Sequence, residues 1–130
     1  MRSIMSVITA ITIFFQCLFG IGGLGFGKVV LVLEKDVYTV GTEAIDAVLY
    51  NCTREPILVA PYMYSLERHE ADGWTRVELK DDVDIPIANF FLQPLERANK
   101  SFRLTDHDTL SAGRYRLQAS GSAYAEFELV

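Results

Sequence analysis

The side chains that most often do chemistry in proteins are few in this chain of 130 residues. It has two histidines, His69 and His107, and the second lies between two carboxylates in Asp106-His107-Asp108. Such a trio could bind a metal ion or transfer protons. Asp and His are also common in exposed loops, and His69 follows Glu67 on the same face of an expected strand. We therefore expect solvent-facing side chains at both histidines rather than a site.

A run of carboxylates, Asp81-Asp82-Val83-Asp84, is the second candidate, because carboxylate oxygens are ligands that Ca²⁺ prefers. Calcium needs about six to eight oxygen ligands around a sharp turn. The run contains no glycine to make that turn, and no glutamate follows at the spacing of a calcium loop. The sequence therefore predicts a solvated acidic loop without a metal ion.

A nucleophile with its catalytic partners is also missing. The sequence contains no G-x-S-x-G motif. Cys52 is the only cysteine after residue 27, and a catalytic thiol needs a nearby base and a site that lowers its pKa. Residues 28–130 contain no second cysteine, so we expect Cys52 to be an unpaired thiol that forms no disulfide within this part of the chain. We expect it to be either partly buried or occasionally bonded to a cysteine of another molecule. We expect no catalytic residue, no metal and no cofactor, and the chain is not predicted to be an enzyme.

Two classes of nucleotide binding are not expected either. Gly20, Gly22 and Gly25 match G-x-G-x-x-G, but a dinucleotide site needs this pattern between a strand and a helix, and the segment that follows has a strand pattern. The chain has 12 basic and 17 acidic residues, for a formal net charge of −5. A broad basic face for nucleic acid is therefore not expected.

Charge divides the chain into two parts. After Met1 and Arg2, the 25 residues from Ser3 to Gly27 carry no charged side chain, and most of residues 4–19 are apolar. A positive start, an apolar run and small residues before a polar region are typical of a secretory signal, and the run is also long enough for a membrane anchor. Both interpretations place residues 28–130 outside the cytoplasm, because Arg2 keeps the N-terminus inside. A buried helix of a cytoplasmic protein is the third alternative.

Cys17 lies within this apolar segment, as the lipidated cysteine of a bacterial lipoprotein does. Lipoproteins have a small residue directly before that cysteine, whereas Gln16 stands here after Phe14 and Phe15. We therefore expect Cys17 to be a small apolar residue of the segment rather than a lipid attachment site.

The remaining 103 residues show the period-2 alternation of half-buried strands. Residues 80–95, with Pro86 and Pro94, are expected to be irregular, and Glu70–Gly73 forms a hairpin loop in which Gly73 adopts a positive φ. About eight short strands without a convincing helix predict an all-β fold, either a two-sheet β-sandwich or a small barrel. The sandwich buries the one-sided apolar faces with the fewest parts. Strand patterns cover residues 28–40, 43–50, 57–60, 62–69, 74–79, 96–104, 114–119 and 124–129.

A tyrosine favours one kind of sandwich. Tyr115 stands two residues after Gly113 at the start of the penultimate strand. Immunoglobulin-like sandwiches place a tyrosine corner there, in which the ring fills the end of the sandwich and the hydroxyl bonds a backbone group a few residues upstream. The alternative is an ordinary core tyrosine after a turn.

Several further motifs stand in order along residues 31–120: Tyr38-x-x-Gly41, Ile45 through Asn51, Tyr64-x-Leu66-Glu67-Arg68, Asp72-Gly73-Trp74-x-x-Val77 and Leu110-x-Ala112-Gly113-x-Tyr115-Arg116. In order and spacing they resemble the bacterial immunoglobulin-like domains of exported or membrane-tethered proteins. The resemblance implies the immunoglobulin-like two-sheet β-sandwich, with no catalytic residue and no cofactor. It implies structural roles for Gly73 and Gly113 as turn positions, Trp74 as a core or hairpin aromatic, and Tyr115 as the corner.

These expectations divide the chain into a signal peptide or membrane anchor at residues 1–27 and one sandwich domain at residues 28–130. We expect a non-catalytic binding or scaffold module of the bacterial cell envelope, with an unknown protein partner and with membrane contact only through residues 1–27 if they are not cleaved. If it has a contact surface, the surface is expected at one end of the sandwich, chiefly in residues 80–95, where Phe90 and Phe91 are adjacent. Burial of both rings between the sheets is the favoured alternative for these two residues. A second hypothesis is an inhibitor of an extracellular protease, which would need a long, rigid and exposed loop there.

Overall fold

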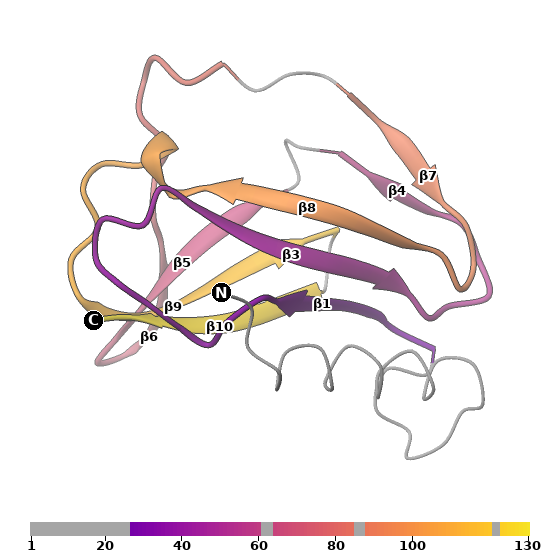
Figure 1. The fold of residues 1–130 in the computed structure, drawn as a ribbon, viewed down its shortest axis with the longest axis horizontal. Coiled ribbons are helices and arrows are strands. Elements are labelled where there is room, and N and C mark those ends of the chain that lie inside the picture. Colours follow the sequence, from indigo (N-terminus) through magenta and orange to yellow (C-terminus); the bar gives the residue numbers. More distant parts are fainter. Residues whose placement is uncertain (1–26, 61–63, 85–87, 121–122) are drawn as a thin grey trace.

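The computed structural model describes residues 27–60, 64–84, 88–120 and 123–130 (Figure 1). Except for Gly27, the predicted export segment lies outside the described residues, and so do the predictions made for Cys17 and for the glycines before residue 27. The described part is all-β, with ten strands and a short 3-10 turn at Leu104–Asp106. None of its helices is long and apolar enough to cross a membrane.

One sheet has three antiparallel strands with β3 in the middle. Ile45, Ala47 and Leu49 of β3 are buried, as their alternation predicts, because every second side chain of a strand points to the same face. Phe102 of β8 pairs with Ile45 and is buried beside it. The strands of this sheet are β1 (Val29–Leu33), β3 (Ala44–Asn51) and β8 (Arg97–Arg103).

The other sheet has five strands in the order β2-β10-β9-β5-β6. All its pairs are antiparallel except β2 with β10, which run parallel. After β1, the polar residues 34–36 interrupt the apolar run. The chain then crosses to the other side of the core, where β2 joins the five-stranded sheet. The strands are β2 (Val37–Tyr38), β5 (Ser65–Glu70), β6 (Gly73–Arg76), β9 (Gly113–Ala119) and β10 (Ala123–Leu129).

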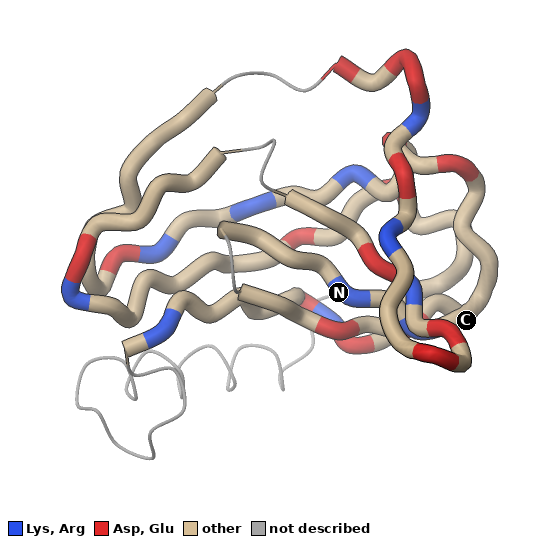
Figure 2. The backbone as a smooth tube through the Cα atoms, turned by 180° about the vertical axis from the view of Figure 1, so that it is seen from behind, with Lys and Arg blue, Asp and Glu red and all other residues tan. Residues whose placement is uncertain are grey.

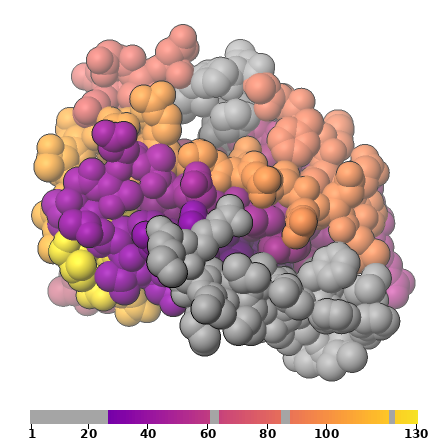
Figure 3. Space-filling model, viewed as in Figure 1, coloured from indigo at the N-terminus to yellow at the C-terminus, as the bar shows by residue number. Residues whose placement is uncertain are grey.

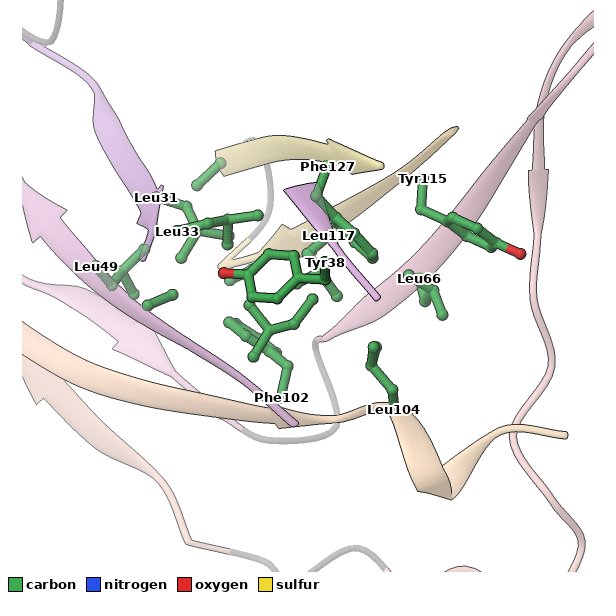
Figure 4. Packing of buried hydrophobic residues seen from close by; sticks show 14 of the residues in the cluster. Leu31, Leu33, Tyr38, Leu49, Leu66, Phe102, Leu104, Tyr115, Leu117 and Phe127 are labelled. Carbon is green, nitrogen blue, oxygen red and sulfur yellow. The ribbon is translucent and has the colours of Figure 1, made fainter. Parts of the chain in front are cut away.

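The two sheets pack face to face and enclose one core, so the structure is a β-sandwich. Figure 4 shows leucines and aromatic rings from both sheets meeting in this core. Tyr115 stacks on Phe127 within the five-stranded sheet at 5.6 Å between ring centroids, and Tyr38 meets the same Phe127 edge-on at 5.9 Å. The largest fully buried side chains are Tyr115, Ile45, Leu49, Leu66, Leu117 and Asn51.

A pair of short strands, β4 (Ile57–Val59) and β7 (Phe90–Leu92), forms a separate two-stranded ribbon; β4 follows β3 in the chain and β7 precedes β8. Figure 1 shows this ribbon at the end of the molecule opposite the C-terminus. The prediction that residues 80–95 are irregular is therefore wrong for residues 90–92. A run of three apolar residues is too short to show a period, and here it forms a strand because it pairs with a segment more than 30 positions earlier.

Candidate binding surface

The ribbon of β4 and β7 presents the two aromatic residues that the sequence proposes as a contact. Phe91 pairs with Leu58 and Phe90 pairs with Val59. The side chain of Phe91 is 63% exposed and that of Phe90 is 42% exposed, so both rings lie at the surface rather than between the sheets. The space-filling view shows the segment that contains β7 and the start of β8 on the outside of the molecule (Figure 3). Because the two residues are consecutive on β7, their rings project from opposite faces of the ribbon. Large exposed aromatic rings are uncommon on the surface of a monomer and are typical of contact sites.

The residues beside the two rings hold the ribbon to the body of the sandwich. Leu92 and Val59 are buried and belong to the main core. The hydroxyl of Ser120, just after β9, donates to the carbonyl of Leu58 at 3.2 Å. The ribbon is thus held from both sheets, and the exposed rings stand on a fixed base.

The amide side chain of Asn51 joins the ribbon to the end of β3. Its Nδ2 donates to the carbonyls of Leu92 and Glu55, both at 2.8 Å. Its Oδ1 accepts from the backbone N–H of Thr53 at 3.0 Å and from the hydroxyl of Thr53 at 2.6 Å. Asn51 is fully buried, and these four bonds use both of its donors and both acceptor positions. In the sequence, Asn51 stands only at the end of a family motif, Ile45 through Asn51, and that pattern does not predict these bonds.

Lys100 lies beside the ribbon, on the face of β8 that points toward the core, which is unusual for a charged side chain. It alternates with Ala98 and Phe102, whose side chains pack in the core, so it starts on the inward side of the strand. Its Nζ lies 5.7 Å from the centroid of the Phe90 ring, and burial lowers the pKa of this ammonium group. β8 is at the edge of its sheet, where an inward-pointing charge discourages pairing with a further strand.

At the opposite end of the sandwich, Tyr115 forms the interaction expected of a tyrosine corner. Its ring is fully buried and its hydroxyl donates to the carbonyl of Ser111 at 2.7 Å. Arg68 donates to the same hydroxyl at 2.8 Å and stacks over the ring at 5.4 Å from the centroid. It also bonds the hydroxyl of Ser111 and the carbonyl of Ala112. The corner fixes the turn that leads into β9.

The order of the strands and the tyrosine corner agree with the comparison against known families. The model of the bacterial Ig-like domain matches residues 26–128. The chain belongs to the bacterial Ig-like domain family. The match spans the whole sandwich and almost all of the residues that the structure describes.

Comparisons with individual proteins add no function to this Ig-like domain. No curated protein matches it. Among solved structures it is similar to an alkylpurine DNA glycosylase, AlkC, of Pseudomonas fluorescens bound to DNA with an abasic site analog, at 20% identity and a TM-score of 0.40. It is also similar to a β-glucosidase from Listeria innocua in complex with glucose, at 10% identity and a TM-score of 0.38. The matches cover 82% and 78% of this chain but only 31% and 16% of those proteins.

The other structural positions proposed from the sequence lie at turns and on the surface of the Ig-like domain. Gly73 follows the β5–β6 turn with a φ of 129°, which side-chain-bearing residues rarely adopt. At Gly113 an added Cβ would lie 3.1 Å from the guanidinium of Arg68, so the glycine leaves room for that side chain. Trp74 is outside both buried clusters, on β6, where it packs edge-on against His69 at 5.0 Å between ring centroids. It is a hairpin aromatic and not a core residue.

His107 is buried, which corrects the expectation of an exposed loop side chain. Only 3% of His107 is exposed, and its Nε2 lies 2.8 Å from the hydroxyl of Tyr64. Its Nδ1 lies 3.0 Å from the carbonyl of Glu78, so Nδ1 carries the hydrogen and Nε2 accepts from Tyr64. Burial lowers the pKa of His107 and raises the pKa of the Tyr64 hydroxyl. His107 thus joins Tyr64 and the backbone of residues 78 and 79 to the turn that follows β8.

The remaining chemistry candidates do not converge in the described residues. Asp81, Asp82 and Asp84 are exposed on the connection after β6, where Figure 2 shows a run of acidic positions. Within residues 27–60, 64–84, 88–120 and 123–130, no group of three His, Cys, Asp or Glu side chains is arranged to hold a metal ion. His69 is exposed on β5, where it pairs with Trp74 of β6.

Cys52 differs from the expectation of an unpaired thiol. It is 4% exposed and is disulfide-bonded in the structure. The other cysteine of the chain, Cys17, lies outside the described residues. The sequence pattern within residues 28–130 could not reveal the bond, because that part of the chain contains only Cys52.

Proposed function

We propose that this protein is an exported, non-catalytic binding module of the bacterial cell envelope, and that it contacts a protein partner through Phe90 and Phe91. The observation that carries the proposal is the exposure of two adjacent phenylalanines on a ribbon fixed by Leu92, Val59 and Asn51. Burying an exposed aromatic ring stabilises a complex most when the ring is already held in place, because less conformational freedom is lost on binding.

The location outside the cytoplasm is part of the proposal. It is supported by the uncharged run from Ser3 to Gly27 after a single basic residue, which is the pattern of a signal peptide or an anchor. The bacterial family to which the sandwich belongs is compatible with an envelope protein. A binding module needs a stable contact surface and no catalytic group. The ribbon offers such a surface, because buried residues hold it in place.

The test compares partner capture by matched variants of the tagged full-length chain, expressed in its source cells and extracted with the envelope fraction. Phe91→Ser removes the most exposed ring, and Val37→Ser, on β2 at the other end of the sandwich, removes an apolar side chain that is 48% exposed. We expect Phe91→Ser to lower the enrichment of one envelope protein about tenfold, the loss of roughly 1.4 kcal/mol. We expect Val37→Ser to leave the enrichment unchanged, as measured by quantitative mass spectrometry.

Three results would contradict the proposal. Equal loss of the partner in both variants would show that the ribbon is not the contact. An intact Met1 on a soluble chain in the cytoplasm would contradict the location. Inhibition of an extracellular protease without any enriched envelope protein would favour the alternative of a protease inhibitor. That alternative has less support, because β7 takes residues 90–92 out of the long loop that an inhibitor would need.

A further inference from the structure

The outward face of the five-stranded sheet carries an ordered row of charges. Glu126 of β10 pairs with Arg116 of β9, Arg116 pairs with Glu67 of β5, and Glu67 pairs with Arg76 of β6. Paired residues point to the same side of a sheet, so these four side chains form one line across four strands. The signs along the line are negative, positive, negative and positive. Figure 2, which views the molecule from this side, shows both signs of charge on these strands.

The centre of this row is rigid. Arg116 donates to both carboxylate oxygens of Glu67, at 3.0 and 3.3 Å. Its guanidinium lies 4.5 Å from the ring centroid of Trp74 and 4.3 Å from that of Tyr124, so two aromatic rings hold it as well. Only 24% of the Arg116 side chain is exposed, although the residue lies on the outer face of the sheet.

The residue types in this row and in the two rings beside it are those common in protein contact surfaces. Trp, Tyr and Arg are the residues that contribute most to protein–protein association. Side chains that are already fixed lose little freedom when a partner covers them. The two acidic and two basic residues of the row cancel, so the row itself adds nothing to the net charge of −5 that would make two copies of the chain repel. Glu126, at one end of the row, also pairs with Arg114 of its own copy at 2.7 Å, and both side chains are half exposed.

The alternation of sign identifies the partner. We propose that two copies of this chain associate through this face, with a twofold axis parallel to the strands and midway between β9 and β5. Such an axis lays the row of one copy over the reversed row of the other, so that Glu126 meets Arg76 of the second copy and Arg116 meets Glu67 of the second copy. An axis along β9 itself would place Arg116 over Arg116. A twofold contact uses the same patch on both copies and must be self-complementary, as this row is.

Charge reversal at the two ends of the row tests the pairing. The full-length chain is produced with two different tags in one cell, extracted in mild detergent, and the copurification of the second tag is measured. We expect the unaltered chain to copurify with itself, less so at high salt. Arg76→Glu alone and Glu126→Arg alone should each weaken self-association about tenfold or more, because each places like charges opposite one another. Copies carrying Arg76→Glu should associate again with copies carrying Glu126→Arg, because every pair across the axis then has opposite signs.

The recovery in the mixture also shows that both variants are folded. Arg103→Glu is the matched control, because it makes the same charge change on the other sheet, at a side chain that is 72% exposed. It should leave self-association unchanged. Absence of self-association in the unaltered chain, single reversals without effect, or a mixture that does not recover would each overturn the proposal. The proposal does not depend on the ribbon, so loss of envelope capture by Phe91→Ser has no bearing on it.

Discussion

Single residues at the ends of this sandwich do more than fill space. The ring of Tyr115 packs in the core, while its hydroxyl donates to Ser111 and accepts from Arg68. Arg68 in turn uses the space left by Gly113. The sequence suggested the role of the tyrosine from its spacing to the glycine, but the arginine carries no such signal, because it stands 47 positions away along the chain.

Tyr115→Phe tests the tyrosine corner directly. The variant keeps the ring and its packing and removes the hydroxyl that bonds Ser111 and Arg68. We expect the free energy of unfolding to fall by about 1 kcal/mol, the usual net contribution of a hydrogen bond, as measured by urea denaturation. Tyr124→Phe is the control, because Tyr124 is 44% exposed. A midpoint for Tyr115→Phe equal to that of the control would argue against the corner.

At the scale of elements, β4 and β7 depend on contacts outside their own sequence. Each has three residues, which is too short for an isolated pair to be stable in water. Their position is fixed by burial of Leu92 and Val59 and by the amide of Asn51. The exposed phenylalanines are therefore held in place by buried residues of the ribbon and by Asn51.

Asn51→Ala tests how far the ribbon depends on that amide. The substitution removes four hydrogen bonds, including the one that Asn51 donates to the buried carbonyl of Leu92. We expect a loss of about 2–3 kcal/mol in the free energy of unfolding and faster amide exchange in β7 than in β9, measured by hydrogen–deuterium exchange. Asn99→Ala, at an exposed position of β8, should change neither. Unchanged exchange in β7 of Asn51→Ala would show that the ribbon is held without the amide.

At the scale of the whole molecule, His107 connects three parts of the chain that the sequence separates. It bonds Tyr64 at the start of β5 and the carbonyl of Glu78 after β6, and Leu79 forms a bridge with its backbone. Phe102 of the opposite sheet packs on Tyr64 at 5.1 Å between ring centroids. The histidine thus helps to close one end of the sandwich.

The buried His107 makes the stability of the molecule depend on pH. Burial lowers its pKa in the folded state, with Arg76 acting in the same direction and Asp106 in the opposite one. As the pH falls below about 6.5, the unfolded chain therefore binds a proton more readily than the folded chain, and stability decreases. We expect the free energy of unfolding to fall between pH 7 and pH 5, and this slope to be smaller in His107→Gln, as measured by denaturation at each pH. His69→Gln, at an exposed position, should keep the original slope; a reduction equal to that of His107→Gln would exclude His107 as the cause.

The alternation of side chains was enough to predict the all-β class, most strand positions and the inward faces of β3, β9 and β10, because the period of two is a local property of a half-buried strand. The sequence also pointed to Tyr115 and to the pair of Phe90 and Phe91. The strand at residues 90–92, the exposure of Phe90 and Phe91 and the burial of His107 became visible only once the chain was folded. These properties depend on partners far along the chain, such as β4 for β7 and Tyr64 for His107, and a local pattern carries no information about which distant segment will cover a side chain. The charge row across β10, β9, β5 and β6 has the same origin, because its four residues become neighbours only when the register of the sheet is set.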